Sequence, residues 1–152
     1  MKKTLPIAGV FGFVALLVFS QFLLAADGGE DPKPKVVESS MHEFMEYVFQ
    51  PTYKRLRTSM KNEPADKAAW KAIKSDSLVL AESTNLLMLR SPEEKAELWN
   101  QIAAQTRSEG GKLYKAAGAK DFTKAGEHYR AMLTKCNACH TEFADGEYQL
   151  QP

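Results

Sequence analysis

The sequence predicts an all-α fold, arranged as an antiparallel up-down-up-down four-helix bundle. Four long stretches carry apolar residues at helical spacing, and no stretch shows convincing period-2 alternation. The connectors near residues 61–64 and 117–120 are short. Short loops between long amphipathic helices favour antiparallel neighbours, which leads to this bundle.

The N-terminal residues 1–26 are predicted to be a secretory signal. Lys2 and Lys3 precede a long apolar run that ends in the small residues Ala25 and Ala26. A run of about 20 apolar residues is also long enough to remain as an uncleaved membrane anchor. Both alternatives put the rest of the chain in the periplasm or another exported space, with membrane attachment only if the anchor is retained.

A flexible linker is expected at residues 27–35, because Gly, Pro and charged residues dominate there. Residues 36–152 that follow are enough for one domain and too few for two. Loss of Lys2 and Lys3 with the signal takes the formal charge from +1 to about −1. A near-neutral domain without a basic tract argues against nucleic-acid binding.

The first helix is expected over residues 36–60. Pro51 falls inside it, so we expect a kink or a local break near Gln50. The apolar side of this helix consists of Val37, Met41, Phe44, Met45, Val48 and Leu56.

The second helix is expected over residues 65–89. Ile73, Leu80 and Leu87 recur every seven residues in it, beside Trp70. This spacing puts all three on one helical face, which predicts a core-facing stripe.

The third helix is expected to begin at Ser91-Pro92-Glu93-Glu94, which combines an N-cap serine, proline at the first helical position and a capping-box glutamate. It should continue to about Ala116, with Gly110 and Gly111 weakening or bending it. Its apolar face consists of Leu98, Trp99, Ile102 and Ala103.

The fourth helix is expected to start near Asp121 and to end past Phe143, before Asp145-Gly146. One face of it carries Phe122, Ala125, Tyr129, Met132, Leu133 and Cys136.

The two cysteines of the chain both lie in the segment from Cys136 to His140, with the sequence Cys-Asn-Ala-Cys-His. Two thiols three residues apart on one helical turn can each add to a vinyl group of the same porphyrin. The adjacent His140 then presents an imidazole nitrogen to the iron as the proximal ligand. The motif therefore predicts one covalently attached haem c per chain, held by Cys136, Cys139 and His140.

Three other interpretations of this motif agree less well with the sequence. A thioredoxin-like redox pair would need a βαβ context, which the sequence lacks. A zinc site needs about four ligands, and His42 and His128 do not form a finger spacing with the cysteines. A chance occurrence runs against the export signal and the all-helical pattern.

With its haem motif in the last helix, the chain resembles the class II cytochromes c, that is, the cytochrome c′ family and its low-spin four-helix relatives. The resemblance covers roughly residues 36–144, and the run from Leu133 to Phe143 is close to the attachment helix of that family. The resemblance implies a non-enzymatic protein that exchanges single electrons with redox partner proteins. Dimerisation through the outer faces of the first two helices is common in the family, which leaves a homodimer open.

The resemblance also implies that the sixth iron ligand comes from the first helix, and aligning the helix on the family pattern puts Met45 there. A methionine makes the iron six-coordinate and low-spin, which suits electron transfer. A bulky apolar residue would leave the iron five-coordinate and able to bind nitric oxide or carbon monoxide, which is the alternative function. The chain carries Met41 where the family often has a basic residue that contacts the haem propionates.

The sixth ligand has alternatives in the same helix. Met45 is also simply explained as a core methionine. Met41 lies one turn earlier and would ligate if the helix register differs. His42 would give bis-histidine ligation, but it is rotated by about 100° from Met41. His128 is expected to have a structural or surface role.

Overall fold

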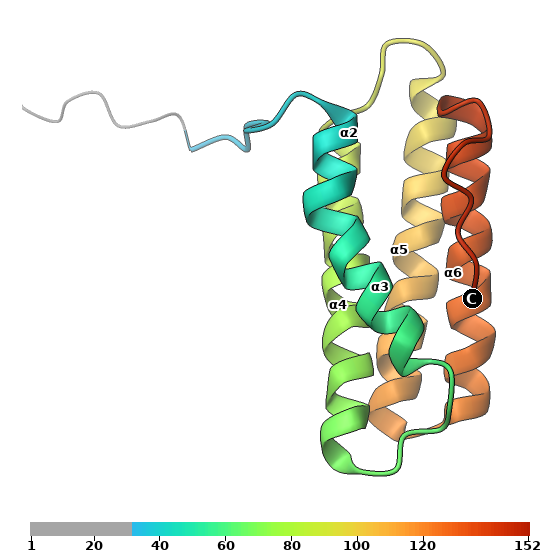
Figure 1. Ribbon diagram of the computed structural model, residues 1–152. Coiled ribbons are helices and arrows are strands. Elements are labelled where there is room, and N and C mark those ends of the chain that lie inside the picture. Colours follow the sequence, from blue (N-terminus) through green and yellow to red (C-terminus); the bar gives the residue numbers. More distant parts are fainter. Residues whose placement is uncertain (1–31) are drawn as a thin grey trace, which may run out of the picture. The chain divides into compact units, whose positions relative to one another are not determined.

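The computed structural model describes residues 32–152, in which helices and no strands are found (Figure 1). The predicted signal at residues 1–26, and the first part of the predicted linker, lie outside the described residues. Pro34–Pro152 form one compact unit. No helix in the described part of the chain is both long and apolar enough to cross a membrane. The predicted all-α bundle with four helical segments is confirmed.

The first helical segment begins at Met41, later than predicted. Ser40 has extended backbone angles, and its hydroxyl accepts a hydrogen bond from the amide of Glu43 at 3.3 Å. A serine at this position satisfies an amide that has no partner inside the helix. Val36 and Val37 precede this cap and are 41% and 98% exposed, so the prediction that Val37 belongs to the apolar side is wrong.

This first segment is built from three consecutive pieces. They are α2 (Met41–Phe44), the π-helix η1 (Met45–Phe49) and α3 (Gln50–Ser59). The amide of Gln50 donates to the carbonyl of Met45, five residues earlier. Pro51 has no amide to donate, so a wider turn just before it accommodates the ring. The expected disturbance near Gln50 is therefore present as a π turn, and the helix is not interrupted.

Two of the other helices begin directly after an aspartate. The start near Asp121 is as predicted, and the second predicted helix begins two residues later than its predicted start at residue 65. The helix α4 is Lys67–Met88 and α6 is Phe122–Phe143. The carboxylates of Asp66 and Asp121 each accept a hydrogen bond from the amide three residues later, at 2.8 and 3.0 Å. These caps fix the first turns of both helices.

The remaining helix, α5, is Ala96–Ala119, so the predicted capping box at Ser91 is wrong. Lys95 has φ 57°, in the left-handed region, which separates the Ser91–Glu94 stretch from the helix. The Ser91 hydroxyl donates to the carbonyl of Ala96 at 3.4 Å and caps no amide. At the other end α5 extends three residues beyond the prediction and stops at Lys120, which has φ 58°.

Gly110 allows α5 to lie close to α4, and neither Gly110 nor Gly111 breaks the helix. A β-carbon built on Gly110 would stand 3.0 Å from the β-carbon of Ala81 and 3.3 Å from the sulfur of Met132. The same atom on Gly111 would meet nothing within 4 Å. The expected weak point is thus a position of tight packing, where a larger residue would separate the helices.

Apolar side chains form two clusters along the bundle, which we call the Leu56 cluster and the Trp99 cluster. Phe49 packs against both. The predicted core residues of α4, α5 and α6 are confirmed as buried, apart from Leu98, Phe122 and Cys136, which are partly exposed. The Leu56 cluster consists of Leu56, Trp70, Ile73, Leu80, Leu113, Ala116, Ala117, Ala125, Tyr129, Met132 and Leu133. The Trp99 cluster consists of Phe44, Leu87, Trp99 and Ala103.

The helices are not equally close to one another. The helix α3 packs on α4, α4 on α5, and α5 on α6 (Figure 1). Among the described elements, no Cα atom of the first helical segment lies within 8 Å of one in α6. Side chains, and the residues that follow α6, therefore fill the space between these two elements.

We expect the substitutions Gly110→Ala and Gly111→Ala to have opposite effects on stability. At Gly111 the methyl group is unobstructed, so the gain in helix propensity should raise the free energy of unfolding by about 0.5–1 kcal/mol. At Gly110 overpacking against Ala81 should outweigh that gain and lower it by about 1 kcal/mol. Urea titration of the two variants measures both, and equal stabilisation would contradict the close approach of α4 and α5.

Candidate functional site

The two thiols lie on one turn of α6 and face different clusters. Cys136 packs against the Leu56 cluster, whereas Cys139 packs against the Trp99 cluster. Both cysteines are free and partly exposed. The segment from Cys136 to His140 therefore lies where the two clusters meet, with Phe49 of the first helical segment in contact with both.

Burial keeps both thiols protonated at neutral pH. Loss of solvation raises the pKa of the Cys136 thiol to about 12, and the neighbouring Cys139 adds to this effect. Burial likewise raises the pKa of the Cys139 thiol to about 11. Thiolates are the forms that attack disulfides and oxidants. Burial therefore lowers the reactivity of both cysteines towards disulfides and oxidants.

His140 is held by a backbone carbonyl beyond the end of the helix. Its Nδ1 lies 2.9 Å from the carbonyl oxygen of Tyr148. A carbonyl only accepts, so Nδ1 carries the hydrogen and Nε2 keeps its lone pair. Burial lowers the pKa of the imidazole, and the hydrogen bond to Tyr148 opposes this in part. At neutral pH the side chain thus offers an unprotonated Nε2, the form that binds a metal ion.

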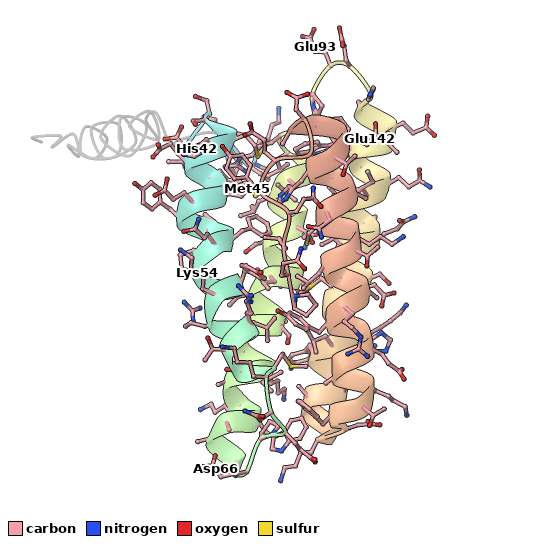
Figure 2. The ribbon with its side chains drawn as sticks, turned by 45° about the vertical axis from the view of Figure 1, so that its right-hand side comes forward. His42, Met45, Lys54, Asp66, Glu93 and Glu142 are labelled. Carbon is pink, nitrogen blue, oxygen red and sulfur yellow. The ribbon has the colours of Figure 1, made fainter. Side chains whose placement is uncertain are left out.

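Met45 lies on the first helical segment and packs against the cluster that Cys139 also contacts. Figure 2 shows it at the same end of the bundle as Glu142, two residues after His140. Met41 packs against this cluster too, and both methionines are partly buried. The structure therefore brings Met41 and Met45 to the same apolar region as the thiol of Cys139.

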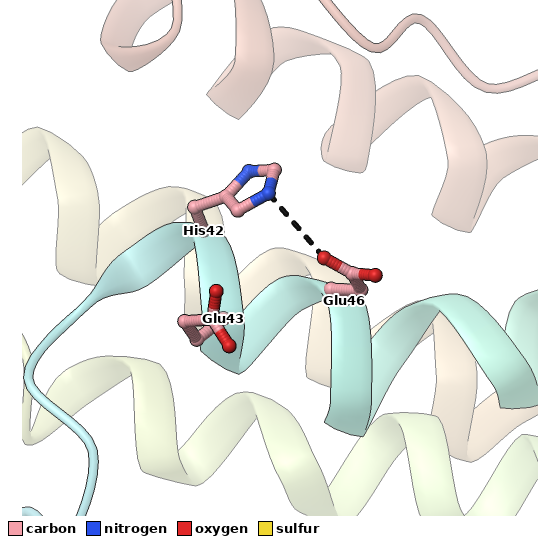
Figure 3. A group of neighbouring side chains, drawn as sticks. All are labelled: His42, Glu43 and Glu46. Atoms are coloured by element: carbon pink, nitrogen blue, oxygen red, sulfur yellow. Dashed lines mark ion pairs between the residues drawn. The ribbon is translucent and has the colours of Figure 1, made fainter.

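His42, by contrast, is directed towards solvent. Its side chain is 64% exposed, and Nε2 lies 3.3 Å from a carboxylate oxygen of Glu46 (Figure 3). Together with Glu43 these residues place three candidate ligand atoms within 4.8 Å of one another. Exposed acidic groups of this kind are common on helices, and here the i, i+4 spacing alone explains the pair.

His128 is part of an ion-pair group and not of the thiol region, as the sequence suggests. Its Nδ1 lies 2.9 Å from a carboxylate oxygen of Glu109 on α5. Lys112 bonds the other carboxylate oxygen of Glu109. The three side chains link α5 to α6, which is a structural role.

The basic residues of α3 differ in their partners. Lys54 donates to Gln50 at 2.7 Å. Arg55 pairs with Asp76 of α4 at 2.8 Å, which ties the two helices together. Arg57 lies near enough to the hydroxyl of Tyr129 to influence its pKa.

The hydroxyl of Tyr129 is a buried polar group without a hydrogen-bond partner in the described part of the chain. The residue is 3% exposed, and burial strongly raises its pKa. Tyr53, Arg57 and Cys136 are its titratable neighbours. Since buried hydroxyls are rarely left without a partner, this one is available to an acceptor that binds beside Cys136.

Two contributors to the site were missed in the sequence. Tyr148 bonds the imidazole through its backbone, which no side-chain pattern can reveal. Asn137, between the two cysteines, bonds the backbone of Leu150 with both ends of its amide. The haem motif leaves the residue at this position unspecified, so the sequence pattern does not indicate a role for the amide.

Comparison with protein-family models, with curated proteins and with solved structures finds no match to this chain.

We expect Glu109→Gln to lower the free energy of unfolding at pH 7 by about 0.5–1 kcal/mol. The hydrogen bond from Lys112, followed by that from His128, holds the pKa of Glu109 below its ordinary 4.5, despite partial burial. A lowered pKa stabilises the folded protein above pH 4.5, and this is lost as the pH falls through the pKa of the folded state.

The difference in the free energy of unfolding between the original chain and Glu109→Gln should therefore shrink as the pH falls below 4.5. Chemical denaturation at several pH values measures it, with Glu97→Gln on the exposed side of α5 as the control. A difference that persists unchanged in acid would show that the carboxylate charge is not the cause.

Proposed function

We propose that this protein is an exported one-electron carrier with one haem c per chain, rather than an enzyme. In this proposal Cys136 and Cys139 form the thioether bonds. His140 is the proximal iron ligand and Met45 the distal one. Redox partner proteins are its expected partners.

One observation supports this proposal above all. Two free thiols and an imidazole with an unprotonated Nε2 lie within five residues of one helix, and a methionine of another helix packs against the same cluster as the thiol of Cys139. This donor set suits a covalently held haem with histidine and thioether ligands. The buried hydroxyl of Tyr129 is close to Cys136 and has no hydrogen-bond partner among residues 32–152, so it provides a donor for a polar substituent of the same group.

A haem bound here would supply iron that alternates between the ferric and ferrous states. The residues of this chain would limit the structural rearrangement that accompanies this change of oxidation state. The two clusters exclude water, and rigid apolar surroundings limit reorganisation when the charge of the iron changes. His140 would hold the iron through Nε2, while Met45, a weaker donor than a second imidazole, would raise the reduction potential.

We also propose that neighbouring helices run in opposite directions, as in an up-down-up-down bundle. Ion pairs between helices support this, because the residue numbers of the paired side chains rise along one helix while they fall along the other. Between α5 and α6, Lys95 pairs with Glu142 and Glu109 pairs with His128. Such a bundle commonly builds its cofactor site in the core between facing helices.

The N-terminal residues support export in two ways. If residues 1–26 are cleaved as a signal, the mature protein begins near Asp27; if they are retained, they anchor the protein to a membrane. Covalent attachment of a haem suits either case, because a merely bound haem can be lost outside the cytoplasm.

The second candidate is a gas-binding protein with a five-coordinate iron. The partial burial of Met45 among Phe44 and Val48 favours it, because in this candidate the methionine is held as a core residue instead of binding iron. The distal side would then be apolar and open to nitric oxide or carbon monoxide. A homodimer is compatible with either candidate.

The absorption spectrum of the purified holoprotein, oxidised and reduced, separates these candidates. Low-spin bands with a weak methionine-to-iron charge-transfer band, unchanged by carbon monoxide, are expected for the carrier. High-spin bands that shift with the gas would make the gas-binding function the correct one. A protein without covalently attached haem would remove both.

We expect Met45→Ala to convert the low-spin spectrum to a high-spin one that responds to carbon monoxide. Loss of the partly buried side chain should also lower the free energy of unfolding by about 1–2 kcal/mol. The matched control is Met41→Ala, one turn away in the same cluster, which should keep the low-spin spectrum. If the two variants behave the other way round, Met41 is the ligand.

We expect His140→Ala to lose normal proximal ligation whichever residue lies on the distal side. Haem should remain attached through the two thioethers, so mass spectrometry should still detect it. A native spectrum in this variant would contradict the whole assignment of the iron site.

A further inference from the structure

The residues after α6 fold back along the bundle instead of leaving it. Figure 1 shows Ala144–Pro152 as the dark red trace that returns beside α6. Asp145, Gly146 and Tyr148 have φ values of 50°, 77° and 59°, in the left-handed region that reverses the chain. The amide of Gly146 donates to the carbonyl of His140 at 3.1 Å, which closes the end of the helix. We call Ala144–Pro152 the return segment.

Asn137 fastens the return segment to α6. Its Nδ2 donates to the carbonyl oxygen of Leu150 at 3.0 Å, and its Oδ1 accepts from the amide of Leu150 at 2.7 Å. One side chain thus satisfies both backbone groups of one residue, which fixes the orientation of the amide. The side chain of Leu150 packs against the Leu56 cluster, so apolar contact holds the same residue.

Tyr53 fastens the return segment to the first helical segment. Its hydroxyl donates to the carbonyl oxygen of Gln151 at 2.7 Å and accepts from the amide of Gln151 at 3.1 Å. Arg57 adds a longer bond, 3.4 Å, to the carbonyl oxygen of Pro152. The return segment therefore bridges two helical elements whose own backbones stay more than 8 Å apart.

The fastened segment places a backbone carbonyl against the imidazole of His140. The carbonyl oxygen of Tyr148 lies 2.9 Å from Nδ1 of the imidazole, while the Tyr148 side chain is 63% exposed. The backbone of Tyr148, and not its ring, thus makes the hydrogen bond to the imidazole of His140. Two residues further on, Asn137 holds Leu150, so the position of this carbonyl depends on that bond.

We propose that the return segment is a strap that positions the proximal iron ligand, with Asn137 and Tyr53 as the positioning residues that hold it. This inference rests on the proposed function, because it assigns a role towards the same haem. The strap keeps Nδ1 of His140 as the hydrogen-bond donor, fixes the rotation of the ring and leaves Nε2 for the iron.

The strap has an electronic consequence. A histidine whose Nδ1–H donates to a carbonyl is a more basic ligand through Nε2. A more basic ligand stabilises ferric over ferrous iron and so lowers the reduction potential. The amide of Asn137, between the two cysteines, would therefore tune the potential without touching the iron.

The test uses the holoprotein and three variants: Asn137→Ala, Asn137→Asp and Tyr53→Phe. Amide exchange at Leu150, the Nδ1–H proton signal of His140 and the reduction potential are measured for each. Asn137→Ala should speed exchange at Leu150 by about tenfold or more, broaden the Nδ1–H signal by exchange with water, and raise the potential. Asn137→Asp keeps the oxygen that accepts from the amide of Leu150, so its exchange at Leu150 should lie between those of the original chain and Asn137→Ala.

Tyr53→Phe retains the ring and removes only the hydroxyl, so the variant should fold normally. It should shift the Leu150 exchange, the Nδ1–H signal and the reduction potential in the same direction as Asn137→Ala. Thr134→Ala is the matched control on α6, because within the described part of the chain that exposed side chain bonds only the carbonyl of Arg130. It should change none of them.

Two results would overturn the strap. Unprotected Leu150 in the unmodified holoprotein would mean that the segment is not fastened when haem is bound. A freed segment with an unchanged potential and Nδ1–H signal would mean that it does not position His140. A chain without covalent haem, which its mass reveals before any variant is made, would instead remove the proposed function together with the strap.

Discussion

The separation between the first helical segment and α6 is the constraint on which the other features of the site depend. The remaining neighbours pack closely, and the absence of a side chain at Gly110 lets α5 approach Ala81 of α4. Between the first segment and α6 the backbones do not approach, and partly buried side chains from both occupy the space instead. Met45, Phe49 and the two thiols all belong to that set. A flat, largely apolar group between these elements would replace side-chain contacts without breaking any helix.

Desolvation favours the neutral form of both thiols and of the His140 imidazole. It raises the pKa of both thiols and lowers that of His140, so all three are neutral at pH 7. Neutral groups are less costly to bury than charged ones, which is why a site of this kind can lie between two apolar clusters. The hydrogen bond from His140 to Tyr148 then selects which ring nitrogen is free. Electrostatics and hydrogen bonding thus lead to the same outcome, an imidazole ready to bind a metal through Nε2.

The π turn adds a further constraint on the distal side. It begins at Met45 and ends just before Gln50, so the candidate ligand stands at the start of the irregular turn. Turns of this kind often occur at functional positions, because the extra residue rotates the side chains that follow relative to those that precede. Pro51 accounts for the π turn, because it lacks an amide hydrogen. In the proposed haem site this turn would set the orientation of Met45 relative to the residues that follow it.

The sequence by itself determined the helical class and most of the helix boundaries, and it is the source of the haem proposal for Cys136, Cys139 and His140. Periodicity and aspartate caps are local properties, so the starts of α4 and α6 could be predicted to within two residues. The start of α5 could not, because a serine, a proline and a glutamate form a capping box only if the backbone continues as a helix, and Lys95 turns it into the left-handed region. Gly110 was likewise judged by intrinsic propensity, whereas its neighbour Ala81 decides its effect. Only the tertiary structure brought Leu150 to Asn137 and the carbonyl of Tyr148 to His140, because these bonds involve backbone groups, which every residue carries and which no sequence pattern distinguishes.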